Sequence, residues 1–97
     1  MTAKITDDQW VWVLIQDPGK NEQIAGQQDV ASKLSFIPVF QSKEDAWRCT
    51  GRLSLDKERQ YEPQAILVED LRQFAAKAGF QLFVLNADGE IIEKKQP

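Results

Sequence analysis

One stretch limits the possible folds more than any other, because in it an apolar run leads directly into a helix start. Residues 36–40 read Phe-Ile-Pro-Val-Phe, a composition typical of a β-strand. Ser42 can cap a helix with its hydroxyl, and Asp45 follows three residues later as in a capping box. Small and apolar residues then recur at helical spacing, at Ala46, Cys49, Thr50 and Leu53. This order predicts half of a β–α–β unit, which a strand at residues 65–68 completes.

A second helix and the elements after it are marked more clearly still. Glu69 and Asp70 suit the positive end of a helix dipole, and Gly79 suits the left-handed conformation that often ends a helix. Phe80 is then expected to fold back on Ala75 in a Schellman arrangement. The predicted elements are a helix from Glu69 to Gly79, a strand over 80–85, a hairpin turn at 86–89 and a last strand over 90–93.

The first third of the chain is harder to interpret. Residues 10–16 predict a strand that is apolar on both faces, so it is covered on both sides or lies in an interface. Residues 20–34 hold few apolar side chains, and we expect a loop with at most one helical turn. A loop of this length is uncommon without a role. It is either a surface excursion that covers a sheet edge or a binding loop.

The resulting order β-β-α-β-α-β-β predicts the α+β class, as a two-layer sandwich. Right-handed crossovers would place both helices on one face of a mixed five-stranded sheet. The strands at 36–40, 65–68 and 80–85 should then run parallel, with the last strand antiparallel to its neighbour. We expect a single domain over residues 1–97, with 1–9 and 94–97 frayed.

Composition excludes several classes of partner. The net charge of −3 argues against duplex nucleic acid and against an anionic membrane surface. The longest apolar run, residues 10–15, is far shorter than the roughly 20 residues that a membrane span needs. Cys49 is the only cysteine, so no internal disulfide can form, and the first residues hold no apolar leader. We therefore expect a cytoplasmic protein.

The residue inventory also limits the chemistry. There is no histidine, which removes Ser-His-Asp and Cys-His nucleophiles and the commonest transition-metal ligand. Cys49 alone cannot build a zinc site, and its place on the apolar helix face predicts a buried structural thiol. We therefore expect no metal, no cofactor and no enzymatic activity.

Two groups of residues could still form sites. Arg48 and Arg52 lie one turn apart on the polar helix side and could bind an anion, although a solvated face explains them equally well. Trp10 and Trp12 share one strand face, and with Phe83 they could form a protein interface or a platform for single-stranded nucleic acid. The acidic balance of the chain disfavours the nucleic acid.

Two segments resemble a known group of proteins. FIPVFQSKEDAWRC and YEPQAILVEDLRQFAAKAGFQLFVLNADGEI look like small uncharacterised bacterial α/β domains, with the N-terminal domain of SseB-like proteins as the nearest named relative. The likeness covers about residues 36–92 and lies in structural motifs. It implies a two-layer α/β module without known catalysis, so no functional residues carry over.

These observations favour a non-catalytic cytoplasmic module that acts through protein–protein contacts or self-association. If both helices cover one sheet face, large side chains stay bare on the other, and soluble monomers seldom leave such a patch open. We therefore expect a homodimer with Trp10, Trp12 and Phe83 at its interface. The alternative is a small-molecule or anion-binding domain that uses residues 17–34 with Arg48 and Arg52.

Overall fold

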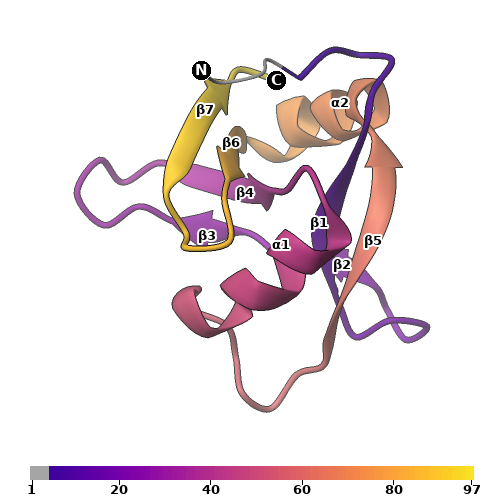
Figure 1. Ribbon diagram of the computed structural model, residues 1–97, viewed down its shortest axis with the longest axis vertical. Helices are drawn as coiled ribbons and strands as arrows, with labels where there is room; N and C mark the ends of the chain where they lie inside the picture. The colour runs from indigo at the N-terminus through magenta and orange to yellow at the C-terminus, as the bar shows by residue number, and fades with distance from the viewer. Residues whose placement is uncertain (1–4) are drawn as a thin grey trace.

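Seven strands, two α-helices and one 3₁₀ turn are found in residues 5–97, which are the residues that the computed structural model describes (Figure 1). The elements are β1 (Trp10–Gln16), β2 (Gln23–Ile24), β3 (Gln27–Gln28), β4 (Ser35–Val39), α1 (Lys43–Cys49), η1 (Thr50–Arg52), β5 (Tyr61–Leu67), α2 (Val68–Ala78), β6 (Gln81–Leu85) and β7 (Ile91–Lys95). The α+β class is confirmed.

The strands form two sheets, so the predicted single five-stranded sheet is wrong. The first has the order β2-β1-β5 and is antiparallel, and the second has the order β3-β4-β6-β7. The sheets meet where Trp12 and Phe40 exchange two backbone hydrogen bonds, each 2.8 Å long. Residues 23–28 also bridge them, since β2 pairs with β1 and β3 pairs with β4. Residues of both sheets therefore contribute to each of two buried clusters.

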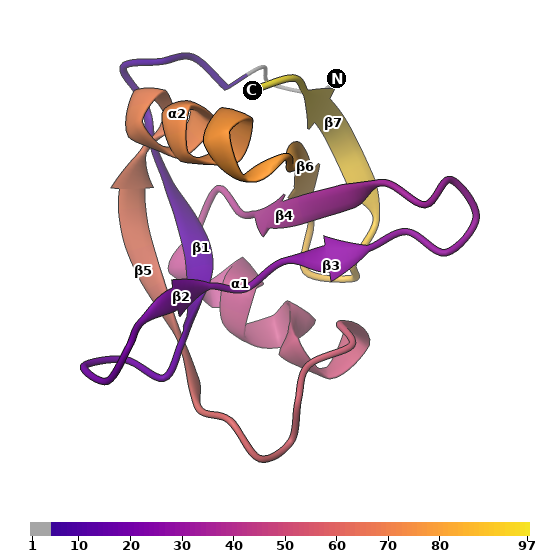
Figure 2. The same ribbon diagram turned by 180° about the vertical axis from the view of Figure 1, so that it is seen from behind.

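The two helices lie on opposite faces of β1, which corrects the prediction that both cover one face. Val11 and Val13 pack in a buried cluster with Leu71 of α2, whereas Leu14 packs in a second cluster with Ala46 of α1. Figure 1 shows α1 in front of the strands, and Figure 2, from behind, shows α2 in front. Helices therefore pack against both faces of β1, although Trp10 at its start stays exposed.

The strand after α1 explains this difference. It was expected at residues 65–68 in a parallel crossover, but β5 begins at Tyr61 and runs antiparallel to β1 along its whole length. The seven-residue helix α1 is followed by η1 and a connector, which carry the chain to the other sheet. Pro63 is tolerated in β5 because it stands opposite Leu14 at a non-hydrogen-bonded pair, so its missing N–H faces the outer edge.

The remaining local predictions hold well. Strands β4 and β6 are parallel neighbours, and β7 is antiparallel to β6. The Ser42 hydroxyl accepts from the Asp45 N–H at 3.1 Å and begins α1. Helix α2 ends at Gly79, whose φ of 81° is left-handed, and the Phe80 N–H donates to the Ala75 carbonyl at 2.9 Å. These contacts are those of the predicted Schellman arrangement.

Two segments form strands or contacts that the sequence did not predict. Residues 20–34, expected to be a loop, contain β2 and β3 and a projecting hairpin between β3 and β4. The ends were expected to be frayed over 1–9 and 94–97, of which 1–4 lie outside the described residues. Ile5 is buried in the core, and its N–H donates to Glu93 of β7 at 3.0 Å. Lys94 and Lys95 belong to β7 of the second sheet.

Candidate functional site

All three tryptophans lie on the α1 side of the first sheet. Trp10 and Trp12 are two positions apart in β1 and therefore share one face of the strand. The Lys43 ammonium lies 6.0 Å from the centre of the Trp12 ring. Trp47 follows Lys43 by one helical turn on α1, the helix that packs against β1 and β5. Trp10 is 63% exposed and Trp47 is 49% exposed. These aromatic surfaces therefore remain accessible to solvent beside the helix.

Strand β5 extends this surface with small apolar residues. Leu67 stands directly opposite Trp10, and Ala65 stands opposite Trp12. Side chains opposite each other in an antiparallel pair share a face and lie close together. We call the surface of Trp10, Trp12, Trp47, Ala65 and Leu67 the tryptophan face.

Phe83, the third residue predicted for the interface, does not reach this surface. It is buried, and its ring stacks on Phe36 with 4.5 Å between the ring centres. The Lys94 ammonium lies 5.2 Å from the same ring. Phe83 therefore stabilises the core beneath α1, while Trp10 and Trp12 share a face of β1 and Trp47 lies on the helix that packs beside that face. The sequence pattern did not single out Trp47, and its helical spacing from Lys43 was the signal that could have found it.

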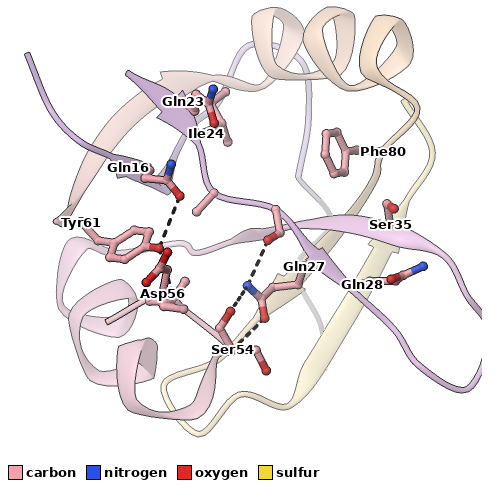
Figure 3. A pocket seen from close by; sticks show the side chains of 13 residues that line it. Gln16, Gln23, Ile24, Gln27, Gln28, Ser35, Ser54, Asp56, Tyr61 and Phe80 are labelled. Atoms are coloured by element: carbon pink, nitrogen blue, oxygen red, sulfur yellow. Dashed lines mark hydrogen bonds between the residues drawn. The ribbon is translucent and has the colours of Figure 1, made fainter. Parts of the chain in front are cut away.

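A second candidate site follows residues 23–28. A groove of about 470 Å³ runs beside this segment, and we call it the edge groove. Its lining is mostly neutral and polar, and among residues 5–97 Asp56 is the one charged residue in it. Figure 3 shows Phe80 on one side of residues 23–28 and Tyr61 with Ser54 on the other side. The groove therefore has an aromatic wall on each side of a strand segment.

Hydrogen bonds fix the wall on the α1 side. The Gln27 side chain accepts from the Ser54 N–H at 2.9 Å and donates to the Ser54 carbonyl at 3.2 Å, as a paired strand would (Figure 3). The Tyr61 hydroxyl accepts from the Asp56 N–H at 3.0 Å and lies 3.4 Å from Gln16 Oε1. The connector after η1, although rich in charged residues, is therefore held beside the groove.

The opposite wall depends on a close contact. A Cβ atom on Gly26 would lie 2.7 Å from Cε1 of Phe80, so only glycine allows the ring to approach the backbone this closely. Phe80 in turn stacks on Phe74, with 6.5 Å between the ring centres and 11° between the planes. Gly26 looked like an interruption in the sequence, but it makes room for the aromatic wall.

A wider depression of about 830 Å³ lies next to the edge groove and is charged. It is lined by both acids and bases, among them Asp17, Lys20, Glu58 and Arg59. Arg59 donates to Asp17 at 2.8 Å. Its charges are therefore largely matched within the depression.

Arg48 and Arg52, predicted for anion binding, line neither hollow. Arg48 makes an exposed ion pair with Glu44 at 2.6 Å, a type of pair worth at most about 0.5 kcal/mol. The side chain of Arg52 passes beside Gly89 in the turn between β6 and β7. The structure brings residues 17–28 to the two hollows but leaves both arginines away from them.

Cys49 lies in the core beneath α1, as its helix face predicted. Burial raises the pKa of its thiol above the ordinary value, and the nearby charge of Arg52 opposes part of this rise. Among residues 5–97, no three carboxylate, thiol or imidazole groups lie close enough to hold a metal ion. The same residues include no helix with the length and apolar character of a membrane span.

Comparison with known proteins places the chain in a family. A search of the curated proteins and a search of the solved structures both gave no match. No link to SseB-like domains was found, so that resemblance is not supported beyond a small uncharacterised α/β domain. One family description matches residues 11–94, which span all seven strands except the first residue of β1 and the last of β7. The chain therefore belongs to the family described as Domain of unknown function (DUF3110).

Proposed function

We propose that this domain is a non-catalytic module that acts through protein–protein contact, and that the tryptophan face is its contact surface. The observation that carries the proposal is the exposure of Trp10 and Trp47, which are 63% and 49% exposed on β1 and on the helix that packs beside it. Tryptophan is among the residues most enriched where binding energy concentrates in interfaces. Monomeric proteins seldom leave large aromatic side chains together in solvent without a role.

The partner that we propose is a second copy of the chain. The earlier reason for a dimer, a sheet face left bare by both helices, no longer applies because the helices cover opposite faces. The tryptophan face offers a different reason, since an isologous dimer buries the same patch twice. Each tryptophan can bury about 150–250 Å², whereas a standard interface buries about 800 Å² per partner. The tryptophans would therefore form the centre of the interface and the polar flank of α1 its rim.

Size-exclusion chromatography with light scattering at tens of micromolar tests this proposal. We expect a mass of twice the 11.1 kDa chain for the wild type. Trp10→Lys combined with Trp47→Lys should give a monomer that unfolds with nearly unchanged stability, because both side chains are exposed. The matched control is Val30→Lys, which adds the same charge at a 90% exposed position on the β3–β4 hairpin. A wild-type monomer, or a dimer that survives the double substitution, would refute the proposal.

The alternative is a small-molecule or anion-binding domain, and it rests on the two hollows that residues 17–28 help to line. An anion site there would have to use Lys20 or Arg59 rather than Arg48 and Arg52. Thermal unfolding in inorganic phosphate tests it. A rise in melting temperature that Arg59→Gln abolishes and Arg48→Gln leaves unchanged would support the alternative.

A further inference from the structure

The sheet edge formed by residues 23–28 differs from the other edges in the described residues. The outer edge of β5 carries Pro63, and the outer strand β7 carries Lys94 and Lys95. Proline and lysine at an edge are common protections against pairing with another chain. Residues 23–28 read Gln-Ile-Ala-Gly-Gln-Gln and contain neither proline nor charge. This edge is therefore chemically open to an added strand.

The backbone geometry shows which groups this edge presents. The N–H of Ala25 donates to Leu14 of β1, and the N–H of Asp29 donates to Leu34, each at 2.8 Å. Backbone groups of a strand alternate in direction, so the intervening residues face away from β1 and β4. Ile24 and Gln28 accordingly stand at non-hydrogen-bonded pairs with Ile15 and Ser35. Their peptide groups and the N–H of Gly26 therefore face away from β1 and β4, along the edge that the edge groove follows.

The walls of the edge groove restrict what can reach these groups. Phe80 rises on the α2 side, and the connector held by Gln27 and Tyr61 rises on the α1 side. A single extended chain can lie between two such walls, with alternate side chains directed to each of them. The edge of a second copy would bring its own walls against these, so a dimer through this edge is sterically disfavoured.

We propose that the edge groove binds an extended peptide segment of another protein, which adds as a strand beside residues 23–28. In strand addition, backbone hydrogen bonds supply affinity and pockets for alternate side chains supply specificity. One side of the peptide meets Phe80 and Ile24, which fit an apolar side chain. The other meets Tyr61 and Asp56, which fit a hydrogen-bond donor or a cation. Because Asp56 is the one charged lining residue in the described part of the chain, the segment is neutral or basic and not phosphorylated.

This inference goes beyond the proposed function, because it concerns a different surface and a different partner. The tryptophan face lies on β1, β5 and α1, whereas the peptide uses the opposite edge of β1 through β2 and β3. Trp10→Lys with Trp47→Lys should therefore abolish the dimer and leave peptide binding unchanged. Failure of either proposal leaves the other standing.

The experiment uses a phage-displayed library of random linear peptides, selected against the wild-type protein, with the enriched peptides then synthesised for titration. The test variant is Gln28→Pro, which removes an outward N–H without breaking a bond to β4, and the matched control is Gln28→Ala, which removes the same side chain only. We expect Gln28→Pro to weaken binding by about tenfold, the equivalent of one lost hydrogen bond, and Gln28→Ala to weaken it by much less. Equal weakening by the two variants would overturn the proposal.

Amide hydrogen exchange gives a second readout that does not depend on a variant. In the protein alone, the N–H groups of Ile24, Gly26 and Gln28 should exchange quickly, and those of Ala25 and Asp29 slowly. A bound peptide should slow the first three and leave the other two unchanged. An absence of enriched peptides, or protection that appears elsewhere on the surface, would overturn the proposal. Protection of the same three N–H groups by protein concentration alone would replace the peptide with a second copy.

Discussion

Two glycines in this chain differ in backbone conformation but not in the space around them. A Cβ atom on Gly79 or on Gly51 would meet no atom within 4 Å. Gly79 has a φ of +81° after the last turn of α2, whereas Gly51 lies in η1 outside the left-handed region. Substitution by alanine therefore measures the left-handed conformation with steric crowding held constant.

The magnitudes follow from the two conformations. Alanine in the left-handed region destabilises the folded state by about 1–2 kcal/mol. Replacing glycine by alanine also lowers the entropy of the unfolded chain, which offsets about 0.4–1 kcal/mol of that cost. Gly79→Ala should therefore lower the free energy of unfolding by about 0.5–1 kcal/mol, and Gly79→Val by more because valine is β-branched. Gly51→Ala gains the entropy term without the strain and should raise it by about 0.4–1 kcal/mol.

Urea denaturation followed by circular dichroism measures the difference, which should be about 1–2 kcal/mol between the two alanine variants. In a domain of this size, such a difference corresponds to about 5–15 °C in melting temperature. Equal stabilities of Gly79→Ala and Gly51→Ala would refute the argument, because they would mean that α2 does not end in a left-handed residue.

Three further predictions concern packing, hydrogen bonding and ionisation. Leu71→Ala should lower the free energy of unfolding by about 2–5 kcal/mol because Leu71 is fully buried, and Phe74→Ala, at a 40% exposed position on the same helix, should cost much less in the same urea assay. Gln27→Ala should lower the free energy of unfolding by about 0.5–1.5 kcal/mol and speed amide exchange at Ser54, because the Ser54 backbone loses both of its bonds to the Gln27 side chain. Unchanged exchange at Ser54 would show that Gln27 does not hold the connector. Above pH 9.0, the ordinary pKa of a thiol here, the wild type should lose stability more steeply than Cys49→Ala, because burial raises the pKa of Cys49 and only the unfolded chain releases the proton easily. Parallel pH profiles of the two proteins would contradict this.

Local features of the fold could be predicted because each depends on a few neighbouring residues. The Ser42 cap needs only a hydroxyl and an N–H three residues later, and the Gly79 terminus needs only a residue without a Cβ. The hairpin turn before β7 likewise follows from Asn86, whose side chain accepts from the N–H groups of Asp88 and Glu90, each at 3.0 Å. Such signals do not depend on the pairing of distant strands.

The sheet topology could not be predicted in the same way, because strand pairing depends on distant residues. Residues 61–64, Tyr-Glu-Pro-Gln, look unlike a strand, yet they pair with β1 because Pro63 falls where no N–H is needed. The sequence after α1 gives no sign that the chain crosses to the other sheet. The right-handed crossover rule applies to two parallel strands of one sheet. It gave the wrong topology here because β5 joins a different sheet from β4.

The candidate sites depend on this topology, so they could be anticipated only in part. Trp10 and Trp12 were paired correctly, because side chains two apart in a strand share a face. The proposal adds Trp47 because α1 packs on the side of β1 where Trp12 lies. The sequence gives even less indication that residues 23–28 form an unprotected strand edge, because Gln-Ile-Ala-Gly-Gln-Gln has little strand propensity by itself. It becomes a strand edge because Leu14 and Phe36 supply partners from two different sheets, and the N–H groups left over then face away from β1 and β4, along the edge that the edge groove follows.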